Sequence, residues 1–117
     1  MIEILRYLTL TGEDVVGHWL ARLRDARARA KIETRFARLA LGNFGDSKAL
    51  QAGIFELRID WGPGYRVYFA MVNSTTALLL NGGDKSTQAA DIKRALKHWT
   101  DFKRRTKNEE KKNKHLS

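Results

Sequence analysis

The sequence predicts a small α+β domain, and three features of its residue pattern indicate this class. Residues 11–42 carry apolar side chains at the spacing of amphipathic helices. Two segments of alternating polarity follow, on either side of the turn Gly62-Pro63-Gly64, and such alternation is typical of strands. Residues 86–102 return to helical spacing. This order predicts two N-terminal helices packed on one face of a mainly antiparallel four-stranded sheet, with a C-terminal helix closing an edge or end.

The first third of the chain predicts one strand and two helices. Residues 2–8 alternate weakly in polarity, which favours a short strand. Thr11 is placed to cap the first helix, and Asp14 stands three residues on, at capping-box spacing. Asp25 is expected to cap the second helix, which should end at Gly42 because glycine adopts the backbone conformation of helix C-termini.

The centre of the chain predicts an antiparallel hairpin around the Gly62-Pro63-Gly64 turn. Proline fixes its own φ, and the glycines reach conformations that other residues resist. Arg58, Arg66 and Tyr68 occupy the polar positions of the two alternating strands, so they should share one face of the sheet. Such a face is suited to holding phosphate groups.

The last third predicts a strand, a helix and a tail. Residues 76–81 are almost continuously apolar, which suits an interior strand covered on both faces, and Gly82-Gly83 should end it. Ser86 or Thr87 is placed to cap the last helix. We divide the chain into a domain, residues 1–102, and a basic tail, residues 103–117, which we expect to be disordered because it is rich in lysine and poor in apolar residues. The tail could be a nucleic-acid arm or a solvated end.

Composition points to a polyanionic partner. The net charge is +9 and the pI about 10.2, which favours nucleic acid first and an anionic membrane surface second. Cysteine is absent, so no disulfide framework is available. The N-terminus does not have the pattern of a signal peptide, and no apolar run approaches the roughly 20 residues that span a bilayer. We therefore expect a cytoplasmic protein that does not enter a membrane.

The residue types present exclude several kinds of site. The histidines, His18, His98 and His115, are scattered, and with no cysteine we expect neither a metal site nor a cofactor. The phosphate-loop spacing is missing around Gly82-Gly83, although backbone amides there could bind one phosphate. The nucleophile elbow of serine hydrolases is missing as well.

A cationic cluster remains. Arg58, Arg66 and Lys85 should converge if the strands that carry them are neighbours. Guanidinium groups bind phosphate in a bidentate manner and stabilise the charge that grows during phosphoryl transfer. Arginine is a poor general base, so Lys85 or a tyrosine would have to move protons, while RNA supplies its own nucleophile, the 2′-hydroxyl. The alternative interpretation is that the two arginines simply pair with Glu56 and Asp60.

Two motifs in this chain resemble a known toxin group. The run from Phe55 to Phe69 resembles the RelE/ParE toxin superfamily. Residues 78–88, followed by Asp91-Ile92-Lys93 and Trp99, are similar to a narrower branch, the addiction-module killer proteins close to HigB-type toxins. The resemblance covers about residues 1–102. It implies a RelE-like fold and a type II toxin that is neutralised by a small antitoxin, commonly of helix-turn-helix type. It also implies inhibition of translation by cleavage of mRNA in the ribosomal A site.

The resemblance also implies site residues. Arg66 matches the second-strand arginine of the superfamily, Arg58 stands where ribonuclease members carry basic residues, and Lys85 lies near another cationic position. The C-terminal tyrosine of some ribonuclease members and the histidines of others have no clear counterpart, so the proton-transfer residues stay unassigned. The expected substrate contacts, in addition to this catalytic group, are Tyr65, Tyr68, Asn81, Arg35 and Arg38.

Three functions are open at this point. The first is a ribosome-dependent endoribonuclease that needs no metal. The second is a non-enzymatic toxin that poisons gyrase, as ParE-like members of the fold do. The third is a basic nucleic-acid-binding module without activity. The arginines on the outer faces of the first two helices fit either RNA contact or a simple solvated surface.

Overall fold

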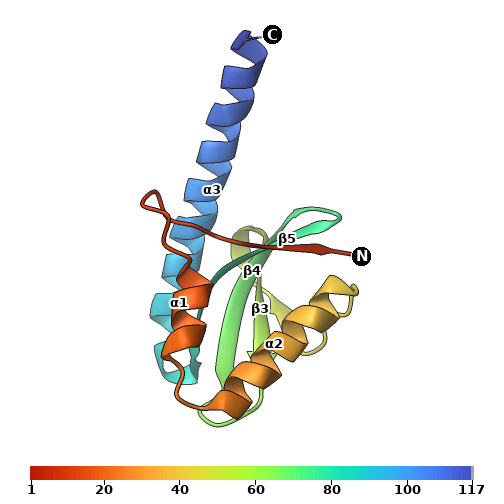
Figure 1. The fold of residues 1–117 in the computed structure, drawn as a ribbon, viewed down its shortest axis with the longest axis vertical. Helices are drawn as coiled ribbons and strands as arrows, with labels where there is room; N and C mark the ends of the chain where they lie inside the picture. The colour runs from red at the N-terminus through yellow and green to blue at the C-terminus, as the bar shows by residue number, and fades with distance from the viewer. Residues whose placement is uncertain (117) are drawn as a thin grey trace.

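Five strands form a single sheet in the spatial order β1-β5-β4-β3-β2 (Figure 1). The computed structural model describes the backbone of residues 1–116 and the side chains through residue 112. The strands are β1 (Glu3–Arg6), β2 (Ser47–Ala49), β3 (Ile54–Ile59), β4 (Tyr65–Asn73) and β5 (Thr76–Asp84). β1 pairs with β5 in parallel, and the other neighbours are antiparallel. The predicted α+β class and mainly antiparallel sheet are confirmed.

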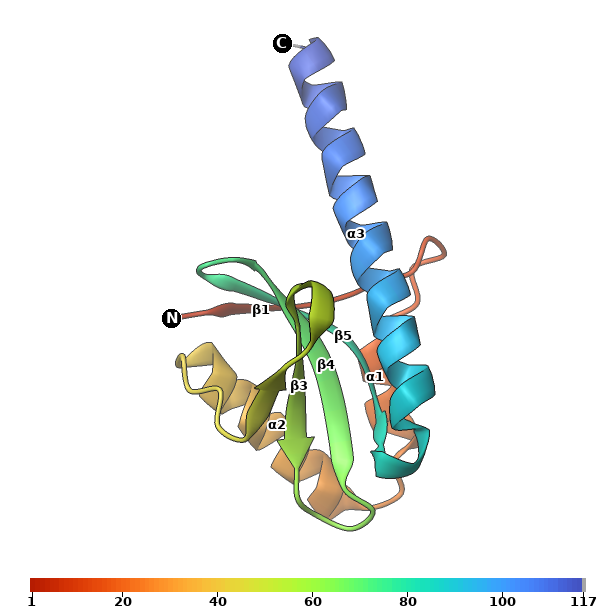
Figure 2. The same cartoon turned by 180° about the vertical axis from the view of Figure 1, so that it is seen from behind.

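Helices cover both faces of this sheet. The helices are α1 (Val15–Arg22), α2 (Ala26–Ala40) and α3 (Gln88–Leu116), with single 3₁₀ turns η1 (Gln51–Gly53) and η2 (Lys85–Thr87). α1 and α2 lie on one face, and α3 lies on the other, as the two opposite views show (Figures 1 and 2). The placement of the last helix at an edge or end was wrong. It covers a face because β4 and β5 present apolar side chains on both sides.

The alternation along β4 and β5 builds two cores. Val67 and Phe69 pack with Leu79 under α1 and α2, and their neighbours in the sequence, Tyr68 and Leu78, pack under α3. All five side chains are almost completely buried. This confirms that β5 is an interior strand covered on both faces, and the burial of apolar area on both sides supplies the main stabilisation of the fold.

The helix boundaries follow side-chain caps. Asp25 accepts hydrogen bonds from the backbone N–H groups of Arg27 and Ala28, as predicted for α2. α2 ends before Gly42, which has a φ of +87°. The cap of α1 is Asp14, which accepts from Gly17 at 2.9 Å, so the assignment of Thr11 as cap was wrong.

Two details of the sheet differ from the prediction. A fifth strand, β2, pairs with β3 along the edge of the sheet, whereas the sequence predicted four strands, because three residues are too few to show alternation. Gly82 and Gly83 lie inside β5 instead of ending it. Trp19 and Asp91 come so close to these two glycines, from opposite sides, that a side chain at either position would collide with them.

Residues 103–116 continue α3 as one helix, whereas we expected disorder. The segment lacks an apolar stripe but is rich in lysine, arginine and glutamate, which favour helix, and it extends a helix already nucleated on the sheet. The side chains from residue 113, including the one of His115, lie outside the described part. The longest dimension of the molecule is 51 Å, against 28 and 25 Å for the others, because α3 projects past the sheet (Figure 2).

Candidate functional site

A polar pocket lies at the end of the sheet where the β3–β4 turn meets the end of β5. Its volume is about 360 Å³. Arg58 of β3 and Arg66 of β4 are directly opposite each other in the sheet, and Lys85 follows the end of β5. The residues that line it are Asp46, Arg58, Asp60, Gly62, Pro63, Gly64, Arg66 and Lys85. The structure thus brings the three predicted cations together.

Glu56 lies beneath the two arginines and fixes their positions. Its side chain is completely buried. One carboxylate oxygen, Oε1, accepts a hydrogen bond from Arg58 Nε at 3.0 Å and lies 3.8 Å from Arg66 Nε. The other, Oε2, accepts from the Tyr68 hydroxyl at 3.1 Å and from Gln88 Nε2 at 2.6 Å. A buried carboxylate that is surrounded by donors holds a fixed orientation, and so do the groups it contacts.

The electrostatics of this network keep Glu56 charged. Burial by itself raises the pKa of Glu56, but hydrogen bonds from Gln88, Arg58 and Tyr68, with the positive charge of Arg58, hold the pKa below its usual value. Burial, with the neighbouring Glu56 carboxylate, raises the pKa of Tyr68 far above its usual value. The Tyr68 hydroxyl therefore stays protonated and cannot act as the base that we considered from the sequence.

The arginines keep their outer atoms available. The Arg58 side chain is 35% exposed and the Arg66 side chain 14%. Arg66 Nη1 donates to the backbone carbonyl of Tyr65 at 3.1 Å, and Arg66 Nε has no hydrogen-bond partner among the described residues. Because Glu56 contacts both arginines, the ion-pair interpretation is partly correct. It does not consume all five N–H donors of either guanidinium.

The turn places Lys85 beside Arg66. The Lys85 backbone N–H donates to the Gly64 carbonyl at 2.9 Å, which ties the end of β5 to the β3–β4 turn. Gly64 has a φ of +81°, a conformation that favours glycine. A Cβ there would come within 3.6 Å of Arg66 Nη1 and 3.7 Å of the Lys85 Cβ, so this position lies between the two cations.

Three predicted contact residues are buried. Tyr68 and Asn81 have no exposed surface, and Tyr65 is 8% exposed, with its ring against Trp19. Asn81 Nδ2 donates to the backbone carbonyl of Asp91, under α3. The prediction that these side chains contact substrate directly does not agree with their burial. Tyr68 and Asn81 lie under α3, and Tyr65 packs on the other face of the sheet, in the core under α1 and α2.

The two predicted arginines of α2 have different surroundings. Arg35 donates to the backbone carbonyls of Arg58, Phe44 and Asp46, which holds the loop before β2 against β3. Its guanidinium is therefore used inside the protein. Arg38 is exposed and lines a neighbouring hollow with Lys31 and Thr34, and Asp60 lines both this hollow and the cationic pocket.

The sequence pattern did not indicate Asp46 or Gln88 as site residues, and it indicated Glu56 and Asp60 only as ion-pair partners of the two arginines. Asp46 and Asp60 line the pocket beside the three cations. Glu56 and Gln88 hold the arginines from below, and the alternation of β3 gave only the face of Glu56, because its burial depends on α3. No group of three or more histidine, aspartate or glutamate side chains in the described part of the chain is arranged to hold a metal ion.

Comparison with known proteins identifies the family. The profile described as "Phage derived protein Gp49-like (DUF891)" matches residues 18–100, well over half of the chain. The chain belongs to this family. The Gp49-like family is a RelE-like toxin family of toxin–antitoxin systems, so the resemblance found in the two motifs is confirmed at this level, without the narrower HigB-like branch.

A relative supports the same grouping. An uncharacterized protein of Haemophilus influenzae (strain Rd) is 58% identical over 77 residues, which cover 66% of this chain and 78% of the relative. The part matched by the Gp49-like profile includes Arg58, Arg66 and Lys85, together with Glu56 and Gln88 beneath them. None of the helices in the described residues is both long enough and apolar enough to cross a membrane.

Proposed function

We propose that this Gp49-like protein is the toxin of a type II toxin–antitoxin system and that it inhibits translation by cutting mRNA on the ribosome. The observation that carries the proposal is the open pocket in which Arg58, Arg66 and Lys85 meet. Two guanidinium groups and an ammonium group suit the binding of a phosphodiester and the stabilisation of its transition state. The proposed site of action is the cytoplasm, and the proposed partner is a small antitoxin of helix-turn-helix type.

The proposed reaction uses the RNA strand as its own nucleophile, without a metal or cofactor. The 2′-hydroxyl oxygen attacks the adjacent phosphorus, and the bond from phosphorus to the 5′-oxygen breaks. The products are a 2′,3′-cyclic phosphate and a 5′-hydroxyl. Arg58 and Arg66 stabilise the charge on the phosphoryl oxygens, and holding the 2′-hydroxyl in line with the leaving oxygen supplies much of the acceleration.

Proton transfer is assigned to the other charged residues of the pocket. A base must take the proton of the 2′-hydroxyl, and Asp46 and Asp60 are the carboxylates that line the pocket. An acid must protonate the leaving 5′-oxygen, and we assign this role to Lys85, which is exposed at the pocket edge. Tyr68 is excluded from proton transfer because it is buried and stays protonated.

The test uses purified ribosomes that translate a defined message. We expect cut message with the wild-type protein and a rate lower by about 10²–10³-fold with Arg66→Ala, the usual effect of removing one group that stabilises transition-state charge. Arg22→Ala, at an exposed arginine on α1, is the matched control and should cut at the wild-type rate. Intact message at doses that arrest growth would refute the proposal, and DNA breaks under those conditions would indicate gyrase poisoning instead.

A further inference from the structure

The outer face of α3 carries a straight row of basic side chains. An α-helix turns by about 100° per residue, so positions can be compared around its axis. We take as reference a line along the helix through Lys93, and all members of the row lie within about 40° of it around the axis. The row extends over 18 residues, or about 27 Å at 1.5 Å per residue. We call these residues the cationic stripe, and they are Lys93, Lys97, Arg104, Lys107 and Lys111.

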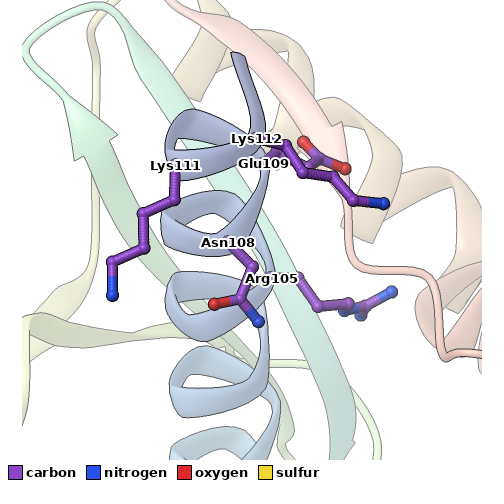
Figure 3. A pocket seen from close by; sticks show the side chains of 5 residues that line it. All are labelled: Arg105, Asn108, Glu109, Lys111 and Lys112. Atoms are coloured by element: carbon purple, nitrogen blue, oxygen red, sulfur yellow. The ribbon is translucent and has the colours of Figure 1, made fainter. Parts of the chain in front are cut away.

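The side chains of the stripe are open to solvent. All five side chains are exposed, and none takes part in an ion pair among the side chains that the structure describes. Among the acidic residues of α3, Asp101 lies about 80° around the axis from the line and pairs with Arg105, whereas Glu110 and Glu109 lie about 100° and about 160° from it. Figure 3 shows Lys111 pointing to the opposite side of the helix from Glu109.

The stripe is separate from the face of α3 that packs on the sheet. The buried residues Ala95 and Trp99 lie about 160° and about 120° from the line. A hollow of about 410 Å³ lies on the stripe itself, lined by Leu96, Lys97, Thr100 and Arg104. The packing of α3 on the sheet therefore leaves the cationic stripe open to a partner along its whole length.

We propose that the cationic stripe binds the phosphate backbone of structured RNA and anchors the protein while the pocket acts on the message. The proposal rests on the proposed function, in that it names RNA as the partner. An extended row of cations spaced by one turn, or two, suits a partner whose negative charges also repeat along a line, as the phosphates of RNA do. A helix that lies on a membrane would need an apolar face beside its charges, and the apolar face of α3 is covered by the sheet.

The stripe begins at the end of the molecule that holds the pocket. Lys85 lines the pocket, and α3 starts three residues later at Gln88, which donates to the Glu56 carboxylate under Arg58. From there the helix runs away from the pocket and past the sheet (Figure 2). RNA held on the stripe can thus be continuous with, or next to, the strand in the pocket.

The test measures binding of the full chain to a fluorescent hairpin of 2′-O-methyl RNA, which lacks the nucleophile and stays intact. Affinity is followed between about 50 and 200 mM salt, because each phosphate contact contributes about 0.7–0.9 to the slope of log K against log salt. We expect the triple variant Lys97→Gln, Arg104→Gln, Lys107→Gln to reduce this slope by about 2. The control, Arg22→Gln, Arg24→Gln, Lys48→Gln, removes the same charge from exposed side chains outside α3 and should keep the wild-type slope.

The outcomes separate the stripe from the pocket. A stripe variant that is folded by circular dichroism and keeps the wild-type slope overturns the proposal. If it instead loses binding to polyglutamate while its RNA slope is unchanged, the partner is an acidic protein and the proposal is again overturned. Arg66→Ala should bind the hairpin through an intact stripe, so a slow Arg66→Ala variant separates the pocket from the stripe. Intact message with a wild-type protein that arrests growth would remove the proposed function without changing the binding result for the stripe.

Discussion

The carboxylate of Glu56 is charged and completely buried, and three side chains donate hydrogen bonds to it. Arg58 Nε, the Tyr68 hydroxyl and Gln88 Nε2 all donate to it, from two strands and a helix. A buried charge is costly unless it is paired and hydrogen-bonded. Glu56 therefore connects the stability of the fold to the geometry of the arginines above it.

We predict that Glu56→Gln destabilises the protein by about 1–3 kcal/mol, the cost of leaving a buried polar group without a partner. The new amide N–H₂ must face one of three donors, so at least one of these hydrogen bonds is lost. The free energy of unfolding from urea denaturation measures the change. Glu33→Gln makes the same substitution at an exposed position of α2 and should leave that free energy within about 0.5 kcal/mol of the wild type.

The same variant tests whether Glu56 positions the arginines. We expect Glu56→Gln, under conditions where it is folded, to cut message more slowly because Arg58 and Arg66 lose their common acceptor. Wild-type cleavage by a folded Glu56→Gln protein would show that the arginines need no support from below.

At the scale of elements, the two consecutive glycines of β5 set how closely α1 and α3 pack on the sheet. A Cβ on Gly82 would lie 2.4 Å from the Trp19 ring of α1. A Cβ on Gly83 would lie 1.9 Å from a carboxylate oxygen of Asp91, which the Thr87 hydroxyl also contacts at 2.5 Å. Neither glycine has a positive φ, so the constraint is one of space and not of backbone conformation.

We predict that Gly82→Ala and Gly83→Ala each cost about 1–3 kcal/mol, as overpacking does in a tight interior. Their spectroscopic effects should differ. Gly82→Ala should change the tryptophan fluorescence through Trp19, whereas Gly83→Ala should chiefly reduce the helical signal by displacing the first turns of α3. Equal and negligible effects on stability would contradict the close approach that the structure describes.

At the scale of the whole molecule, a cluster of side chains joins the two ends of the chain. The Tyr7 hydroxyl, just after β1, donates to Asp101 of α3 at 2.5 Å, and Arg105 contacts the same carboxylate at 2.6 Å. The ring of Tyr7 stacks on His98 with centroids 4.4 Å apart. The charged groups that act on the pKa of His98 are Arg94, Asp101 and Glu13.

This cluster gives the stability a dependence on pH. Burial, with the positive charge of Arg94, lowers the pKa of His98 below its usual value, so the unfolded chain binds a proton at higher pH than the folded protein does. The stability that neutral His98 contributes is therefore fully present above the ordinary histidine pKa of about 6.5. It is lost as pH falls through the lower pKa that His98 has in the folded protein.

We predict that the melting temperature of the wild-type protein falls between about pH 7.5 and about pH 5.5, and that His98→Phe reduces this fall while keeping a ring against Tyr7. The comparison variant is His18→Gln, which changes the histidine on α1 that contacts Glu13 and leaves His98 in place. Parallel curves for the wild type and His98→Phe would show that His98 is not the group responsible.

The fold and the cationic pocket were accessible from the sequence for a physical reason. Alternation along β3 and β4 assigns each residue to a face without knowledge of the neighbours, and the turn between them sets which residues are opposite. Arg58 and Arg66 therefore came together as expected. The burial of Tyr68 and Asn81 could not be predicted in this way, because it depends on which element covers that face.

The sequence by itself determined the order of elements other than β2, the faces of the strands and the three cations that meet at one end of the sheet, because these follow from local periodicity. Only the tertiary structure decided that α3 covers the second face and that Gln88 reaches Glu56. These contacts join residues 32 positions apart along the chain, so no local pattern encodes them. The same packing of α3 buries Glu56 beneath the arginines and turns the cationic stripe outward.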